Sequence, residues 1–139
     1  MKILLINPPV FNDIGRVLTI TPPLGLMYLA AYLEKNGYAN VRVVDADVAK
    51  LSWQDLEDLL VKERPGVVGI TASSFILPAM LKVAEITRRA LPDSIIVTGG
   101  YGPTKEPEKV LRTIDRAINF VVLGEGEITF LELIKRLDN

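Results

Sequence analysis

The fold class follows from the stretch Val67-Val68-Gly69-Ile70-Thr71-Ala72-Ser73-Ser74 and from what surrounds it. An apolar run of strand length passes directly into small polar residues, and a helical pattern begins at Ile76. A strand that turns at once into a helix is the repeating unit of a parallel β/α sheet. In such a sheet the loops after the strands lie at the carboxyl edge, where ligands bind.

The same arrangement recurs along the whole chain. Apolar runs predict strands over residues 3–6, 41–44, 67–70, 94–97 and 119–122. Helical patterns predict helices over residues 22–36, 52–64, 76–91, 107–114 and 127–137, and Ser52 with Asp55 resembles a capping box. This strict alternation predicts an α/β, flavodoxin-like (Rossmann-like) three-layer sandwich, with a five-stranded parallel sheet in the order 2-1-3-4-5.

Four short stretches are predicted to meet at the carboxyl edge of this sheet. They are Asn7-Pro8-Pro9, Thr71-Ala72-Ser73-Ser74, Thr98-Gly99-Gly100-Tyr101-Gly102-Pro103-Thr104 and Gly124-Glu125-Gly126-Glu127. Each follows a strand-like run and consists mainly of residues whose small side chains leave the backbone accessible. Together they predict a wide floor for a large flat ligand.

Composition excludes several functions. The chain has 139 residues, the size of one domain, and its net charge of −1 comes with no basic stripe, so nucleic acid is not expected as a partner. The chain holds no cysteine and no histidine. It therefore supplies no iron–sulfur ligand, thiolate or imidazole, and we expect neither a catalytic residue nor a metal ligand in it. The apolar run of residues 1–6 is too short for a transmembrane segment or signal peptide, which predicts a cytoplasmic protein.

Three familiar chemistries of this fold do not fit the strand ends. A phosphorelay receiver needs carboxylates after the first strand and an aspartate ending the third, where the chain has Asn7-Pro8-Pro9 and Ile70-Thr71. Pro8-Pro9 also lacks the N–H donors that would wrap a flavin phosphate. A Gly-x-Gly at residues 124–126 follows the last strand rather than the first, and its glutamates would repel a pyrophosphate.

One family combines all of the observed motifs in the observed order. They are Pro22-Pro23-Leu24-Gly25-Leu26, Leu29-Ala30-Ala31-Tyr32-Leu33, Gly69-Ile70-Thr71, Thr98-Gly99-Gly100, Pro103-Thr104, Pro107-Glu108 and Gly124-Glu125-Gly126-Glu127 before Phe130. With this order and spacing, essentially the whole chain resembles the N-terminal cobalamin-binding domain of cobalamin-dependent radical SAM enzymes. Its relatives include the anaerobic magnesium-protoporphyrin cyclase and many methyltransferases.

The resemblance implies a role for the chain. Residues 1–139 would form a single cobalamin-binding domain, the N-terminal fragment of a longer polypeptide with a C-terminal radical SAM domain in cis. The parent enzyme, of methyltransferase or porphyrin-cyclase type, would also use S-adenosylmethionine and a 4Fe–4S cluster, neither bound by this chain. The domain alone is not expected to catalyse a reaction.

The resemblance also implies a set of cofactor-binding residues. Glycines at strand ends would let the backbone approach the corrin and its nucleotide tail, and hydroxyl groups would meet the tail base and the corrin amides. By this resemblance the tail base is expected to leave the cobalt, and because the chain has no histidine, cobalamin would be His-off as well as base-off. Its lower face would be left to water or to the loop of residues 7–21, where Val10, Phe11, Leu18 and Ile20 could keep it dry. The expected contacts are Asn7, Pro8, Thr71, Ser73, Ser74, Gly99, Gly100, Tyr101, Gly102, Pro103, Gly124, Glu125 and Gly126.

Simpler interpretations stand beside these. Gly99-Gly100 also suits a plain turn, and the hydroxyls at 71, 73 and 74 also suit helix capping. Glu125 and Glu127 would favour the N-terminus of the last helix through its dipole, and Phe130 is expected in the core. A second function class therefore remains open: an α/β interaction or small-ligand-binding domain without a cofactor.

Overall fold

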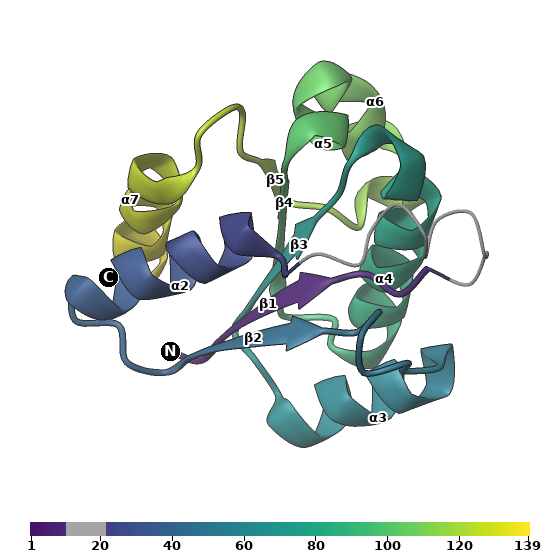
Figure 1. Ribbon diagram of the computed structural model, residues 1–139, viewed down its shortest axis with the longest axis horizontal. Helices are drawn as coiled ribbons and strands as arrows, with labels where there is room; N and C mark the ends of the chain where they lie inside the picture. The colour runs from purple at the N-terminus through teal and green to yellow at the C-terminus, as the bar shows by residue number, and fades with distance from the viewer. Residues whose placement is uncertain (11–21) are drawn as a thin grey trace.

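The strands form one parallel sheet with the predicted order. The computed structural model describes residues 1–10 and 22–139. The strands are β1 (Ile3–Asn7), β2 (Val41–Asp45), β3 (Val67–Thr71), β4 (Ile95–Gly99) and β5 (Phe120–Val121). They lie in the order β2-β1-β3-β4-β5, and every pairing is parallel (Figure 1). Since β1 pairs with both β2 and β3, the strand order reverses at β1, which is where an open α/β sheet forms its crevice.

Helices cover both faces of the sheet. Helices α2 (Leu24–Lys35) and α7 (Glu127–Leu137) pack together on one face, while α3 (Trp53–Glu63) and α4 (Leu77–Ala90) pack together on the other (Figure 1). The short helices α5 (Tyr101–Lys105) and α6 (Pro107–Arg112) connect β4 to β5, together with a 3-10 turn over Ile114–Arg116. Another 3-10 turn, Ser74–Ile76, precedes α4. The fold class predicted from the sequence is confirmed.

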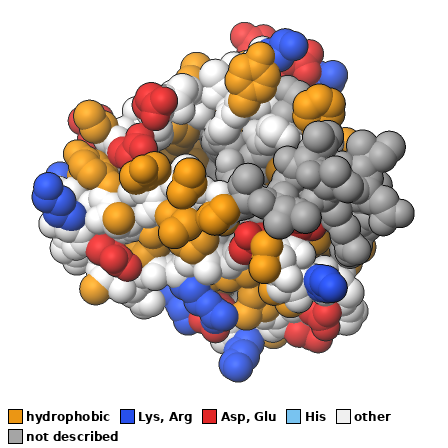
Figure 2. Space-filling view, viewed as in Figure 1, with side chains coloured by type: hydrophobic (Ala, Val, Ile, Leu, Met, Phe, Trp, Pro, Cys, Tyr) orange, Lys and Arg blue, Asp and Glu red, His pale blue; other side chains and the backbone are white. Residues whose placement is uncertain are grey.

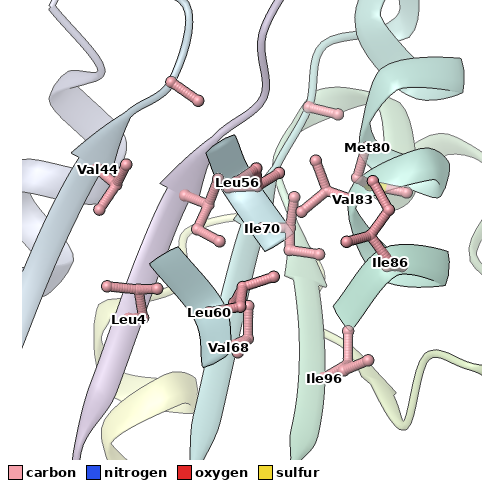
Figure 3. Packing of buried hydrophobic residues seen from close by; sticks show 14 of the residues in the cluster. Leu4, Val44, Leu56, Leu60, Val68, Ile70, Met80, Val83, Ile86 and Ile96 are labelled. Carbon is pink, nitrogen blue, oxygen red and sulfur yellow. The ribbon is translucent and has the colours of Figure 1, made fainter. Parts of the chain in front are cut away.

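Two hydrophobic cores lie on opposite faces of the sheet, because side chains alternate along each strand. Leu4 and Val68 face the core beneath α3 and α4, where Leu60 is fully buried (Figure 3). Leu5 and Val67 face the core beneath α2 and α7. The three central strands β1, β3 and β4 are buried on both faces, as their continuous apolar sequences predict, whereas the edge strands β2 and β5 are partly exposed.

The helix α5 was not predicted. Its residues were expected to form an irregular loop after β4. Gly100 turns the chain with φ = 101°, and the helix begins at the next residue. The Gly102 N–H donates to the Ala72 carbonyl at 3.0 Å, which holds α5 against the end of β3. Pro103 is tolerated because N–H groups in the first turn have no partner within the helix.

None of the helices in the described part of the chain combines the length and the apolar character that a membrane span requires.

Candidate functional site

A pocket of about 360 Å³ opens at the carboxyl edge, between the sheet and the helices α2 and α7. Leu5, Gly69 and Val97 line it from three neighbouring strands. Leu26 and Phe130 line it from the two helices. The walls are therefore largely apolar, and the pocket extends the core beneath α2 and α7 to the surface. We call this the tail-side pocket.

Seven of the residues predicted from the sequence line the tail-side pocket. The sheet register brings two of the predicted stretches together, since Thr71 pairs with Gly99 across β3 and β4. The loop before α7 closes the same opening from the other side. The seven residues are Thr71, Gly99, Gly100, Tyr101, Gly124, Glu125 and Gly126.

Glycine is required at position 100 by both conformation and space. Its φ of 101° is one that other residues rarely adopt. A Cβ there would lie 2.7 Å from the Ala72 carbonyl oxygen and 2.9 Å from Thr71 Oγ1. Gly99 differs, because its nearest atom would be the Val122 carbonyl oxygen at 3.5 Å, an ordinary contact. The turn interpretation therefore holds for Gly100, and the same turn brings the backbone to the pocket.

The polar groups of the tail-side pocket are few. Thr71 is half-buried, with its hydroxyl beside Gly100. Thr104 Oγ1 accepts a hydrogen bond from the Gly124 N–H at 3.1 Å, which ties α5 to the loop before α7. Glu125 and Glu127 are the charged residues at the pocket, and no described lysine or arginine lines it.

A second pocket, of about 200 Å³, lies beside the first over the end of β1. We call it the β1-side pocket. Asn7, Pro8 and Ser73, all predicted site residues, line it. The Asn7 side-chain amide donates to Asp45 Oδ1 at 3.0 Å, so part of its hydrogen-bonding capacity is used within the chain. Asp47 Oδ1 accepts from the Val10 N–H at 2.8 Å. Asp45 and Asp47 thus hold the chain at and after the end of β1 through hydrogen bonds.

Two predicted residues, Gly102 and Pro103, line neither pocket. Gly102 and Pro103 are buried in α5, where they support the edge rather than face it. Ser74 begins the 3-10 turn before α4, and the structure does not describe its side chain. Ser73 precedes that turn but makes no side-chain capping bond, so the capping interpretation is wrong for Ser73. The predicted lower-face residues Phe11, Leu18 and Ile20 lie outside the described residues.

Several lining residues were missed because they lie within strands and helices rather than in loops. Gly69 is the clearest case: a Cβ there would meet Leu5 Cδ2 at 2.7 Å. An isolated glycine inside a strand often marks a close approach, and this signal could have revealed it. Phe130 is buried as predicted, with 3% exposed, and also forms a pocket wall.

Thr98 is a buried residue whose hydroxyl has no hydrogen-bond partner in the described structure. It borders the tail-side pocket. However, Val97 faces the core beneath α2 and α7, and Ile96 faces the opposite core. Alternation therefore places the Thr98 side chain on the side of Ile96, away from the pocket floor. We assign its hydroxyl no role in ligand contact.

Exposed apolar side chains lie on the helices that flank the opening. Figure 2 shows hydrophobic side chains gathered over α2 and around the hollow beside it. Leu24 and Tyr28 on α2 are 56% and 63% exposed, and Ile128 on α7 is 64% exposed. Tyr101 on α5 is 72% exposed. An apolar rim of this kind commonly marks a surface that another component covers.

The architecture and the pocket together define a class of protein. A flavodoxin-like sheet with a glycine-rich pocket at its switch point is a ligand-binding α/β domain. The family model for the B12 binding domain matches residues 13–134, and the chain belongs to that family. The resemblance predicted from the order of the motifs is thereby confirmed.

Similar proteins agree with this family. The chain is 38% identical over 138 residues to an uncharacterized methyltransferase, PH0819, of Pyrococcus horikoshii, covering 99% of this chain and 29% of that protein. It is 33% identical over 141 residues to the anaerobic magnesium-protoporphyrin IX monomethyl ester cyclase of Rubrivivax gelatinosus, covering 99% of this chain and 25% of that protein. The chain thus spans about a quarter of the length of the curated relatives it matches.

A solved structure shows the same fold. It is the cobalamin-dependent S-adenosylmethionine radical enzyme OxsB with aqua-cobalamin and S-adenosylmethionine bound. The TM-score is 0.79 at 22% identity, and the match covers 99% of this chain and 18% of OxsB.

Proposed function

We propose that this chain binds cobalamin at the carboxyl edge of its sheet, with the nucleotide tail in the tail-side pocket and the tail base detached from cobalt. The observation that carries this proposal is the glycine-rich pocket between the sheet, α2 and α7. Its volume of about 360 Å³ falls within the range usual for small-molecule sites. Family membership supports cobalamin as the ligand.

The residues present suit this cofactor. Leu5, Val97 and Phe130 would pack against a flat aromatic base. Gly99 would bring the backbone close to the tail without a side chain between them, and Thr71 would offer its hydroxyl to a nitrogen of the base. When bound, cobalamin supplies a cobalt centre able to carry an alkyl group. The part of this chain is to bind and orient that cofactor and to exclude water from it.

The remaining predicted residues would act around the pocket. Asn7, Pro8 and Ser73 would contact the cofactor from the β1-side pocket. Tyr101, Gly124, Glu125 and Gly126 would contact it from the rim. Gly102 and Pro103 would act by holding α5 in place, and Ser74 belongs to the same proposed set. No protein imidazole can coordinate the cobalt from this chain, because the 139 residues include no histidine.

We further propose that the chain serves as the cofactor module of a larger radical SAM enzyme, of methyltransferase or porphyrin-cyclase type. The relatives named above support this, and so does the apolar rim around the opening, which a second domain would cover. Such a domain in cis would bring the S-adenosylmethionine and the 4Fe–4S cluster. The chain itself would then contribute binding rather than catalysis.

The test combines uptake with spectroscopy. The protein is mixed with hydroxocobalamin and desalted, and the proposal expects a red protein. Reduced to Co(II), the bound cofactor should give an electron paramagnetic resonance spectrum without axial nitrogen splitting. A colourless protein would favour an α/β interaction domain without cofactor. A red protein with clear nitrogen splitting would retain cobalamin binding and overturn the base-off, His-off mode.

A further inference from the structure

The two pockets meet at the first turn of α2. Gly25, Leu26 and Thr71 line both the tail-side pocket and the β1-side pocket. Thr71 is the last residue of β3. Leu26 is 3% exposed and belongs to the core beneath α2 and α7. Gly25 is different, because it is exposed and has no side chain. It therefore lies at the passage between the two pockets.

Nothing in the described residues explains a glycine at position 25. Its backbone is helical, and its φ is not among the positive values found at Gly37, Gly100 and Gly124. A Cβ built on it would have no atom of the described residues within 4 Å, apart from its own helix backbone and chain neighbours. Glycine weakens a helix relative to alanine. The position thus carries a cost in stability with no gain in conformation or packing.

We infer that the space above Gly25 is used by the ligand, which crosses the first turn of α2 there and occupies both pockets at once. This inference rests on the proposed function. For cobalamin, the part that crosses would be the flexible arm joining the corrin ring to the nucleotide tail, since the ring and the tail are its two bulky parts. Gly25 is then a contact and specificity position, because any side chain there would narrow the passage.

The test uses a substitution whose effects on folding and on binding have opposite signs. Gly25→Ala should leave the melting temperature unchanged or raise it, since alanine favours the helix and meets no clash. The same change should weaken hydroxocobalamin binding to the chain, measured by absorbance titration. Gly25→Leu should weaken it at least about tenfold. A purely structural role would not separate stability from affinity in this way.

Ala31→Gly on the same helix is the mirror-image control. Ala31 is exposed and lines neither pocket, so this change should lower the melting temperature and leave affinity unchanged. Unchanged affinity in both Gly25 variants would overturn the inference while leaving the proposed function intact. If the unsubstituted chain takes up no hydroxocobalamin, the proposed function fails and the inference fails with it.

Discussion

At the scale of single residues, the edge of the sheet depends on where a Cβ can be accommodated. Gly100 and Gly99 are neighbours in sequence, yet their surroundings differ. The first is confined by backbone atoms of Ala72, and the second has ordinary room. A side chain added at Gly100 therefore tests backbone strain and steric overlap, whereas one added at Gly99 meets only an ordinary contact.

Gly100→Val should damage both folding and binding. The left-handed φ would cost about 1–3 kcal/mol, and the new side chain would push the turn at Ala72 and Thr71 away from its place. Cobalamin binding should be lost, because the pocket wall moves with that turn. Thermal unfolding and an absorbance titration measure the two effects. Gly99→Ala is the matched control for stability and should keep nearly the full melting temperature. If Gly100→Val bound cobalamin with full affinity, the binding site could not lie at the end of β4.

Thr71→Val should change binding alone, and by less. The substitution keeps the shape of the side chain and removes one hydroxyl, worth about 0.5–1.5 kcal/mol as a net hydrogen bond. Affinity for cobalamin should fall roughly two- to tenfold. Thr113→Val at the end of α6, outside both pockets, should leave affinity unchanged. Equal affinities of the Thr71 variant and the parent would remove Thr71 from the contact set.

The sequence predicted lining residues where small side chains follow an apolar run, as at Thr71 and Gly99. It did not predict Leu5 or Val97, because a pocket wall and a buried core require the same kind of residue. Which strand positions face open space depends on how α2 and α7 leave the carboxyl end of the sheet uncovered. That is a property of packing between distant segments, and no local pattern contains it.

At the scale of elements, the start of α3 shows local sequence signals at their most reliable. Ser52 Oγ accepts from the Asp55 N–H at 3.0 Å, and the Ser52 N–H donates to Asp55 Oδ2 at 3.0 Å. The capping box predicted from the sequence is confirmed. In contrast, α5 was missed, because its formation depends on a contact between Gly102 and Ala72 from another loop.

Ser52→Ala should destabilise the fold by about 1 kcal/mol, the usual value of such a cap. Chemical denaturation measures the change. Ser73→Ala is the control, since Ser73 precedes a helical turn without making a capping bond, and it should leave stability nearly unchanged. Equal losses in the two variants would show that the box adds nothing.

Asp55 gives the same cap a dependence on pH. The hydrogen bond from the Ser52 N–H, followed by that with the Ser52 side chain, lowers the pKa of Asp55. A carboxyl whose pKa is lowered on folding stabilises the protein above its unfolded pKa, and this contribution disappears as pH falls through the lowered value. Asp55→Asn should thus be less stable than the parent at neutral pH, with the gap closing in acid. A gap that does not depend on pH would contradict this.

At the scale of the whole molecule, the strand order was predictable because strict alternation of strands and helices leaves few arrangements for a parallel sheet. The surface at the carboxyl edge of the sheet was less predictable. The exposed apolar residues of α2, α5 and α7 form a rim only because the fold brings these helices to the same pocket at the edge of the sheet.

The two cores of the molecule differ in one respect. Val10 and Ile76 of the core beneath α3 and α4 line the smaller, β1-side pocket, whereas Leu26, Val122 and Phe130 of the other core line the larger, tail-side pocket. A ligand there would complete a core that the polypeptide leaves unfinished. Local opening should accordingly be unequal in the free protein, with amide hydrogens of α2 and α7 exchanging faster than those of α4. Hydrogen–deuterium exchange with hydroxocobalamin should show slowing concentrated in α2 and α7. Uniform slowing across all the helices would mean that the ligand stabilises the fold as a whole instead.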